Sequence, residues 1–368
     1  MKNKIISLAL IAGLAACSGG NPFEAGEEEV VDPTDVVDGE VIGDGEGTGI
    51  ERDGIPPGTV SPSPNASLFR SEPRVDGEGS QVGNGYASGI EYNSESDTFT
   101  VDNLAFDGDR AYTRRDEDGN LNVVTSLNGG EFAVYEGPST AIDPVTGTEI
   151  NQFVYRAVYG VSRNRVGTTD MPTTQFAIIR TGSYVDYGFG GFIYQRDTEV
   201  NLPTSLQAQF TGKSAGLRDF GTETGLQYTT ADVVLDIDFQ DFNDGETIRG
   251  DGVKGRIFNR KVFSLDGVDM TADVTSSLGT EENPVTEIPE IQFEVGPDVL
   301  DDNGDLVTNV QTQLPGSTAA YETGKFYAIV AGDDPNEVVG VFVLETTGGT
   351  SRDTSGFIIY RGETPEIQ

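Results

Sequence analysis

Residues 232–240, DVVLDIDFQ, alternate between apolar and polar side chains along almost the whole stretch. A period of two places alternate residues on opposite faces of an extended chain, which is the pattern of a strand with one buried and one solvated face. The buried face would carry Val233, Leu235, Ile237 and Phe239, and the solvated face mostly Asp232, Asp236, Asp238 and Gln240. The stretch therefore predicts an antiparallel sheet with its core on one side.

Similar strand patterns precede this stretch. Between about residues 84 and 198, short runs such as FAVYEG, TQFAIIRTGS and YGFGGFIYQRD are rich in aromatic and β-branched residues and end at turn formers. In INQFVYRAVYG one face would carry Phe153, Tyr155, Ala157 and Tyr159, and the other Val154, Arg156 and Val158. Residues 81–200 therefore predict an N-terminal β subdomain.

A second series of strands begins after Leu202 and Pro203 and includes LQAQFTGKSAGLRD, EIQFEV, EVVGVFVLETT and TSGFIIYRG. Many successive strands separated by turns favour an antiparallel barrel or sandwich, and closing a barrel removes the strand edges that promote aggregation. The 48 glycines and the absence of tryptophan fit many turns and modest cores. We expect an all-β chain whose residues 201–368 form an antiparallel β-barrel of about eight strands.

Charge and composition exclude several functions. A formal net charge of −38 makes nucleic acid an improbable partner, because neutralising phosphates requires a basic surface. The chain has no histidine and one cysteine, which excludes a Ser-His-Asp triad, an intrachain disulfide and a multi-cysteine zinc site. Paired carboxylates could serve a glycosidase, but none of the 61 acids is singled out. We therefore expect a non-enzyme with no cofactor and no metal site.

The amino terminus has the pattern of an export signal. Two lysines precede an apolar segment at residues 5–16, which is too short to span a bilayer. Leu14-Ala15-Ala16-Cys17 resembles the lipobox of bacterial lipoprotein precursors, whose signal is cleaved before an acylated cysteine. The resemblance implies a signal peptide at residues 1–16 and a lipid anchor on Cys17. A buried cysteine after an ordinary secretory signal is the alternative.

The residues after Cys17 predict which membrane holds the lipid anchor and how far the folded part lies from it. Ser18 stands where an aspartate would retain such a lipoprotein at the inner membrane, so the resemblance implies the outer membrane. Residues 17–80 are rich in acid, glycine and proline, and such a segment buries too little surface to offset its ordering entropy. We expect a disordered, self-repelling linker that holds the folded part away from the membrane.

Three stretches follow one another in the C-terminal region: LPTSLQAQFTGKSAGLRDF, ADVVLDIDFQDFNDGETIRG and GKFYAIVAGDDPNEVVGVFVLE. In this order they resemble the β-barrel domain of the transferrin-binding protein B family of surface lipoproteins. The last stretch matches the family pattern at Gly324, Phe326, Tyr327, Glu337, Val338, Gly340 and Phe342. It departs from that pattern at Ala328-Ile329, where the family has Gly-Pro, and at Val339, where the family has the first of two glycines.

The pattern also has a physical interpretation. Phe326 and Phe342 can fill a narrow barrel, and Gly340 suits a bend or bulge where a side chain would collide.

The resemblance implies a binding protein for a host or environmental protein or a small solute, with nutrient-metal acquisition as one role. The membrane would be contacted through the lipid on Cys17. We expect the cell surface, with the periplasmic face of the outer membrane as the alternative. A structural or adhesion lipoprotein without a soluble ligand is the competing function, because a small barrel filled with side chains is stable without a ligand.

Four short motifs have ordinary interpretations as well as functional ones. DEDGN at 116–120 and DDNGD at 301–305 offer oxygens for calcium but lack the rest of an EF-hand, so they predict turns. Arg249-Gly250-Asp251 lies in a sequence that also favours a turn. NAS at 65–67 has only the form of a glycosylation site. YGFGGFIYQ at 187–195 is a candidate binding surface, with a place in the core as the alternative.

The lipid anchor yields a direct test. Cys17→Ser removes the only thiol that can accept a diacylglyceryl group, so we expect no lipid labelling and an accumulation of unprocessed precursor. Metabolic labelling with a fatty-acid analogue and the mobility of the protein on a gel measure both effects. Normal labelling of the variant would contradict the assignment.

Overall fold

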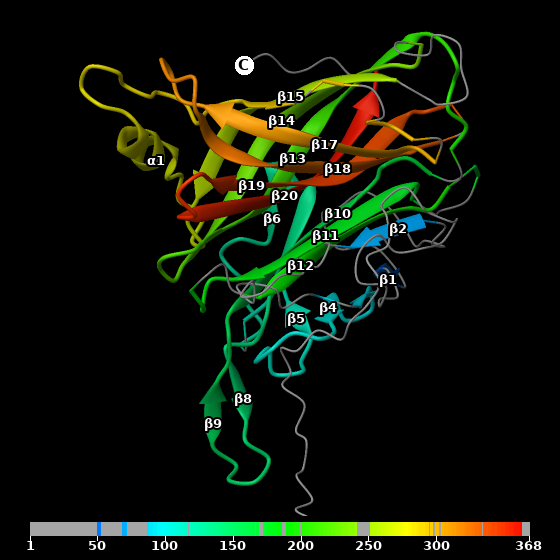
Figure 1. The fold of residues 1–368 in the computed structure, drawn as a ribbon. Helices are drawn as coiled ribbons and strands as arrows, with labels where there is room; N and C mark the ends of the chain where they lie inside the picture. The colour runs from blue at the N-terminus through cyan, green and yellow to red at the C-terminus, as the bar shows by residue number, and fades with distance from the viewer. Residues whose placement is uncertain are drawn as a thin grey trace, which may run out of the picture. The chain divides into compact units, whose positions relative to one another are not determined.

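The structure is a computed structural model that describes residues 50–52, 68–71, 87 and 89–362, except 117, 166, 169–171, 186–188, 199, 241–250, 294, 297–298, 302 and 333. The described chain is all-β. A curled sheet of ten strands precedes a closed barrel of eight antiparallel strands, with one short α-helix, α1 (Thr271–Leu278) (Figure 1). The fold class predicted from the alternating strands is therefore confirmed.

The barrel follows chain order from its first strand to its last. Its strands are β13 (Gln207–Phe220), β14 (Leu226–Asp238), β15 (Gly252–Phe263), β16 (Ile291–Phe293), β17 (Asp305–Gln313), β18 (Ala320–Ala331), β19 (Glu337–Thr346) and β20 (Ser351–Arg361). β20 returns to pair with β13, from Phe210 opposite Arg361 to Phe220 opposite Ser351. Every barrel strand thus has a partner on each side, although β16 pairs over only two residues with each of its neighbours, and closure reduces the edge that is open to unwanted strand pairing.

The barrel interior contains the apolar residues of the alternating strands. Val233, Leu235, Ile237 and Phe239 all belong to the interior cluster. Phe326 belongs to it as well, and its ring centroid lies 4.4 Å from that of Phe293 and 4.8 Å from that of Phe357. The prediction that one face of residues 232–240 is buried is thus confirmed, and the core is partly aromatic.

Gly340 is explained by a close approach of two strands. A Cβ at Gly340 would lie 2.1 Å from the carbonyl oxygen of Tyr327 on the neighbouring strand. The predicted collision is confirmed, but β18 and β19 pair without a register shift there, so the glycine does not mark a bulge.

The curled sheet lies before the barrel in sequence. Its order is β1 (Ile50–Arg52), β3 (Ile90–Asn93), β4 (Thr98–Val101), β5 (Tyr112–Thr113), β7 (Phe132–Glu136), β10 (Tyr155–Val161), β11 (Thr174–Thr181), β12 (Gly190–Arg196) and β2 (Leu68–Ser71), with β6 (Ser126–Leu127) also paired to β7. β1 pairs in parallel with β3, and β2 pairs in antiparallel with β12. Residues 17–80, expected as a linker, thus contribute two short strands to the sheet.

Both faces of the sheet are buried. Tyr155, Ala157 and Tyr159 pack into an aromatic cluster on one face, whereas Val158 packs on the other face against the outside of the barrel. The face assignment made from the period of two is therefore confirmed for β10.

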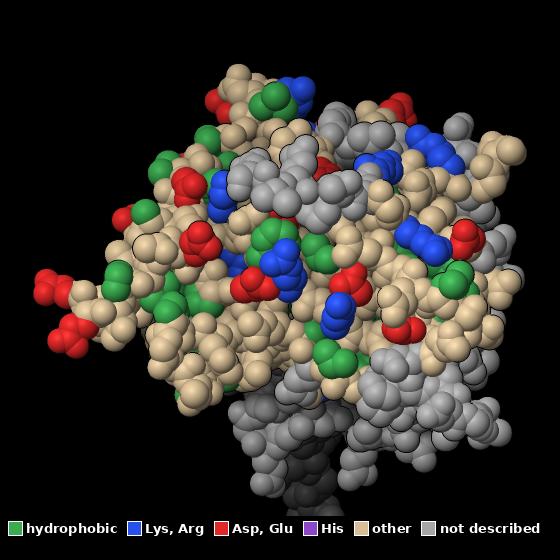
Figure 2. Space-filling model, turned by 90° about the horizontal axis from the view of Figure 1, so that it is seen from above, with side chains coloured by type: hydrophobic (Ala, Val, Ile, Leu, Met, Phe, Trp, Pro, Cys, Tyr) green, Lys and Arg blue, Asp and Glu red, His purple; other side chains and the backbone are tan. Residues whose placement is uncertain are grey.

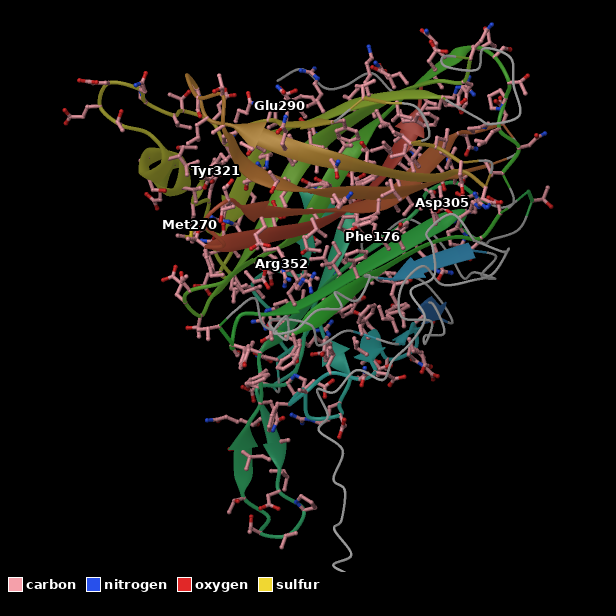
Figure 3. The ribbon with its side chains drawn as sticks, in the orientation of Figure 1. Phe176, Met270, Glu290, Asp305, Tyr321 and Arg352 are labelled. Atoms are coloured by element: carbon pink, nitrogen blue, oxygen red, sulfur yellow. The ribbon has the colours of Figure 1, made fainter. Side chains whose placement is uncertain are left out.

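Phe176 of β11 occupies the contact between sheet and barrel (Figure 3). Its ring lies over two glycines, Gly160 on the neighbouring sheet strand and Gly356 on β20. A Cβ at Gly356 would lie 2.2 Å from Cδ2 of Phe176, and a Cβ at Gly160 would lie 2.3 Å from Cε1. The absence of side chains at these two positions makes the space for the ring.

Two barrel-region elements were not predicted from the sequence. β17 alternates Leu306, Thr308, Val310 and Thr312 toward the buried side, and its two threonines hide the apolar signal. α1 follows the end of β15 and begins after Asp269, whose carboxylate accepts a hydrogen bond from the Thr271 amide at 2.8 Å.

No helix in the described ranges is both long and apolar enough to cross a bilayer.

The contact at Phe176 predicts that Gly356→Ala destabilises the protein. The added methyl group would overlap the phenyl ring, and overpacking of this kind costs about 1–3 kcal/mol in the free energy of unfolding. Urea unfolding followed by circular dichroism measures the change. Gly348→Ala is the matched control, because the nearest atom to a Cβ at Gly348, Cγ2 of Thr350, would lie 3.9 Å away. Equal unfolding midpoints for the two variants would contradict the packing argument.

Candidate functional site

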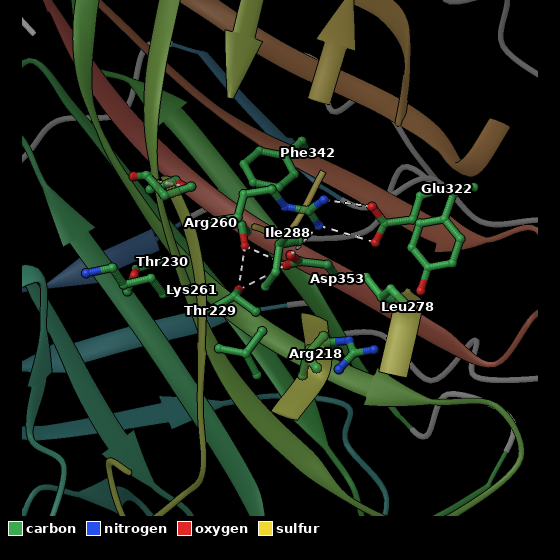
Figure 4. Close-up of a pocket in the computed structure, with 16 residues that line it drawn as sticks. Arg218, Thr229, Thr230, Arg260, Lys261, Leu278, Ile288, Glu322, Phe342 and Asp353 are labelled. Carbon is green, nitrogen blue, oxygen red and sulfur yellow. Dashed lines mark hydrogen bonds and ion pairs between the residues drawn. The ribbon is translucent and has the colours of Figure 1, made fainter. Parts of the chain in front are cut away.

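One enclosed space was found near an end of the barrel. It is lined by Arg218, Thr229, Arg260, Glu322, Phe342 and Asp353, with further residues from α1 and from the segment before β16 (Figure 4). The centre of a water molecule can occupy about 20 Å³ of it, which is room for about one water. This space is too small for an organic solute.

A buried ion-pair network fills this end of the barrel. The Arg260 guanidinium donates to Glu322 Oε2 at 2.7 Å and approaches Asp353 Oδ2 at 3.4 Å. Arg260 also donates to the Pro289 carbonyl at 2.9 Å, and Thr312 donates to Glu322 at 3.0 Å. All three charged groups therefore have partners inside the protein and need no ligand to compensate their burial.

The two carboxyls of this network differ in acidity. Burial raises the pKa of Glu322, but Arg260 and the Thr312 hydroxyl oppose it strongly enough that the pKa lies below its ordinary value. Burial dominates at Asp353 and raises its pKa despite Arg260 and two hydroxyl donors. A pair of carboxyls with separated pKa values can serve acid–base chemistry, but the network has no space for a substrate.

Glu337 joins the sheet to the barrel through a second buried carboxyl. It stands at the start of β19, and its side chain accepts hydrogen bonds from Ser162 Oγ at 2.6 Å and Asn164 Nδ2 at 2.7 Å. The Thr173 hydroxyl also donates to it. Burial raises the pKa of Glu337, although these sheet residues partly oppose the shift. The group is therefore a structural connection and lies away from any open surface.

An aromatic cluster reaches the surface at one end of the sheet. The aromatic surface consists of Phe106, Phe153, Tyr184 and Phe189, whose successive ring centroids lie 5.2 to 6.3 Å apart. Phe106 is 64% exposed and Tyr184 is 42% exposed, whereas Phe153 and Phe189 are half-buried and pack against the aromatic core of the sheet. An exposed aromatic group continuous with the core is typical of an interaction site.

Local hydrogen bonds hold this surface in place. The Phe153 amide donates to the Phe106 carbonyl at 2.8 Å, and the Val154 amide donates to Ser183 Oγ at 3.0 Å. Phe106 has φ of 55°, the left-handed region that a bulky residue adopts at a cost of about 1–3 kcal/mol. The surrounding contacts thus present the Phe106 ring to solvent in a fixed direction.

A hairpin projects from the sheet beside the aromatic surface (Figure 1). Its strands, β8 (Thr140–Ile142) and β9 (Glu149–Asn151), pair with one another in a separate two-stranded sheet. At its base, a Cβ at Gly108 would meet Pro138, Ala141 and Gln152 at 3.4 to 3.6 Å, so the loop after Phe106 packs closely against it. The hairpin exposes Ile142, Val145 and Ile150.

The barrel face seen in Figure 2 has a different character. Lys and Arg side chains lie beside Asp and Glu side chains there, with hydrophobic side chains in small groups between them. Lys254 and Asp236, 3.6 Å apart on neighbouring barrel strands, form an exposed pair of a kind that contributes little stability. Lys213 and Asp232, 2.7 Å apart, form a partly buried pair.

Several sequence predictions can now be compared with the structure. The stretch 187–195 is described from Phe189 onward. Phe192 and Tyr194 of β12 are buried against the barrel, whereas Phe189 is half-buried and belongs to the aromatic surface, so only the β12 part of the stretch is core. DEDGN and DDNGD form turns, in which Asp116 and Asp301 accept backbone amide hydrogen bonds. No group of three or more potential metal ligands occurs among the described residues.

Other predicted positions lie outside the described residues. They are the signal peptide at 1–16, Cys17, the sequon at 65–67, and Arg249 with Gly250.

Phe189 lies in the stretch 187–195, which the sequence offered as a candidate binding surface. Phe106, Phe153 and Tyr184 were missed because they share no local motif with it. The hairpin carried a usable signal, since Asp143-Pro144 and Gly147 punctuate a run between two isoleucines.

No protein-family model and no curated protein matches the chain. Solved structures of transferrin-binding protein B do. A mutant from Haemophilus parasuis Hp5 is 13% identical, with 64% of this chain and 41% of that chain covered and a TM-score of 0.31. A mutant from Actinobacillus pleuropneumoniae H49 is 9% identical, with 54% and 80% covered and a TM-score of 0.29. Intact Ap-TbpB, with its N and C lobes, is 12% identical, with 72% and 44% covered and a TM-score of 0.30.

The chain thus spans about two fifths of the first matched structure, at 41% of its length. Superpositions this loose indicate nothing about the ligand of this chain.

The Glu337 contact predicts a pH-dependent stability difference. Because its pKa is raised in the folded state, Glu337 stabilises the fold most below its unfolded pKa, and this contribution is lost as pH rises through the folded pKa. The Glu337→Gln variant has no ionisable group at this position. From about pH 4.5 upward its free energy of unfolding should therefore rise relative to that of the wild type, by about 1.4 kcal/mol for each unit by which the folded-state pKa of Glu337 is raised.

Urea unfolding between pH 4 and 8 measures this difference. Glu345→Gln, at an exposed position of the same strand, is the control for removal of one carboxylate from β19. A constant difference between Glu337→Gln and the wild type across the range would contradict the assignment.

Proposed function

We propose that this protein is a non-enzymatic binding protein, anchored in the outer membrane by lipid on Cys17, that captures another protein through the aromatic surface. The observation that carries the proposal is the exposure of Phe106 and Tyr184 in a cluster continuous with the sheet core. Buried aromatic side chains dominate the energy of protein–protein contacts, because each brings a large apolar area at low conformational cost.

The barrel supports a protein partner over a small solute. Its interior is packed with apolar side chains, and the space beside Arg260 admits about one water. A solute would have to displace an ion-pair network whose members already bind one another. A protein partner needs only an outer surface, and the aromatic surface together with the neighbouring hairpin offers one.

The sequence resemblance to transferrin-binding protein B makes a host iron carrier the first partner to test, with nutrient-metal acquisition as the biological role. In this proposal the acidic linker after Cys17 holds the folded part away from a negatively charged membrane, and the aromatic surface faces the outside of the cell.

Site-specific photo-crosslinking tests the proposal on intact cells. A photoreactive phenylalanine analogue replaces Phe106 in one variant and Val268 in the control, since both positions are exposed, at 64% and 62%. Cells are exposed to transferrin or to proteins of their growth environment before illumination. We expect one dominant adduct from position 106 that is at least tenfold weaker from position 268.

Tyr184→Ser, combined with the photoreactive residue at position 106, should give less adduct than the position-106 variant alone, because it removes a ring from the same surface. Equal adducts from the two positions, or none from position 106 across the panel, would refute a protein-binding role for this surface.

A further inference from the structure

The projecting hairpin has one open edge. In its register Ala141 faces Ile150 and Ile142 faces Glu149. The Gln152 amide donates to the Ser139 carbonyl at 2.9 Å, and the Asp143 amide donates to the Thr148 carbonyl at 2.8 Å. Hydrogen-bonded pairs in an antiparallel ladder alternate with pairs whose amides and carbonyls point outward. The backbone groups of Glu149 and Asn151 therefore point away from β8.

The two edges of the hairpin differ in one contact. On the β8 side the Arg110 guanidinium donates to the Thr140 carbonyl and occupies one of the outward acceptors of that edge. On the β9 side, no described residue is recorded as a backbone hydrogen-bond partner of Glu149 or Asn151. A strand edge with unpaired amides and carbonyls is a template for another strand.

The side chains around this edge define the chemistry of a partner. Val145 is 89% exposed, and Ile142 and Ile150 are exposed as well, so the hairpin offers apolar contact on both of its faces. Its charged residues, Asp143 and Glu149, are both acidic. The matching segment is therefore extended, with apolar and basic side chains.

We propose that the free edge of β9 binds an extended, basic segment of the partner protein by strand addition, beside the aromatic surface. This inference rests on the proposed function and specifies its partner. Main-chain hydrogen bonds to Glu149 and Asn151 supply affinity, whereas the acidic side chains and the apolar residues select the sequence.

Charge disfavours two other occupants. The chain's own segment from Cys17 to Pro64 is strongly acidic, so it would place carboxylates against Asp143 and Glu149. A second copy paired edge to edge would bring the Glu149 carboxylates of the two chains close together without a basic partner, and like charges at close range are destabilising. A basic segment of a different protein meets neither penalty.

A pair of variants at one position isolates the backbone contribution. Asn151→Pro removes the outward amide hydrogen and leaves the bonds to β8 intact, whereas Asn151→Ala removes the side chain and keeps that amide. Full-length protein is titrated into a fluorescein-labelled octapeptide of alternating lysine and valine, and binding is followed by fluorescence anisotropy. An octapeptide of alternating glutamate and valine is the acidic counterpart.

We expect the basic peptide to bind the wild type and the Asn151→Ala variant, and to bind Asn151→Pro at least tenfold more weakly. The wild type should bind the acidic peptide at least tenfold more weakly than the basic one. The ratio of these two affinities should be smaller in the Glu149→Lys variant. Thermal midpoints of the two Asn151 variants within about 2 °C of each other, a shift of roughly 1 kcal/mol or less, show that the hairpin is retained.

Three outcomes would overturn strand addition. The first is equal binding of the basic peptide by the proline and alanine variants. The second is a dimer in sedimentation velocity that Asn151→Pro dissociates. The third is cosedimentation with phosphatidylcholine vesicles that is lost in Val145→Ser and unchanged in Asn151→Pro, which would assign the hairpin to lipid.

Failure of this inference is separable from failure of the proposed function. If the Asn151→Pro variant still yields the wild-type amount of adduct from position 106, strand addition is wrong and protein binding stands. If the wild type yields no adduct from that position, the proposed function is wrong.

Discussion

The packing of Phe176 between two glycines is the contact on which the arrangement of this protein depends. The ring belongs to the sheet, and Gly356 belongs to the last barrel strand. The sheet and the barrel therefore meet where the absence of a side chain at Gly356 leaves room for the ring. Close packing of this kind fixes position because a shift of even one methylene width is costly. It holds the middle strands of the sheet on the outside of the barrel. The loops that follow those strands, including the one that carries Tyr184, are positioned as a result.

The barrel itself is a support and not a container. Aromatic and aliphatic residues fill one part of its interior, and the Arg260 network fills another. Replacing such a buried network by apolar residues is often neutral for stability, whereas removing one member is expensive, so its presence is better explained by a defined arrangement of the strands around it. The exposed aromatic rings and the hairpin belong to the outer surface of the sheet region, and this is where we propose that a partner binds.

Regular alternation made much of the fold predictable. Residues 232–240 and 153–159 each revealed their two faces, because a strand with a core on one side must obey a period of two. β17 was not predicted from the sequence, because two of its buried positions carry threonines, Thr308 and Thr312, and not apolar residues. The aromatic surface could not be predicted, since Phe106 and Tyr184 come together only through the path of the chain. The expected lipidation site at Cys17 is the reverse case, because the resemblance to a lipobox rests on a local motif that is recognised without any fold.

The pairing of β20 with β13 also sets the order in which the molecule can assemble. These strands are the last and first of the barrel, and β20 carries the glycine over which Phe176 packs. Until residues 351–361 have been synthesised, the barrel lacks its closing strand, and the Phe176 ring lacks its contact with Gly356. Contacts between residues so distant in sequence make folding slow, because a long loop must close before they form.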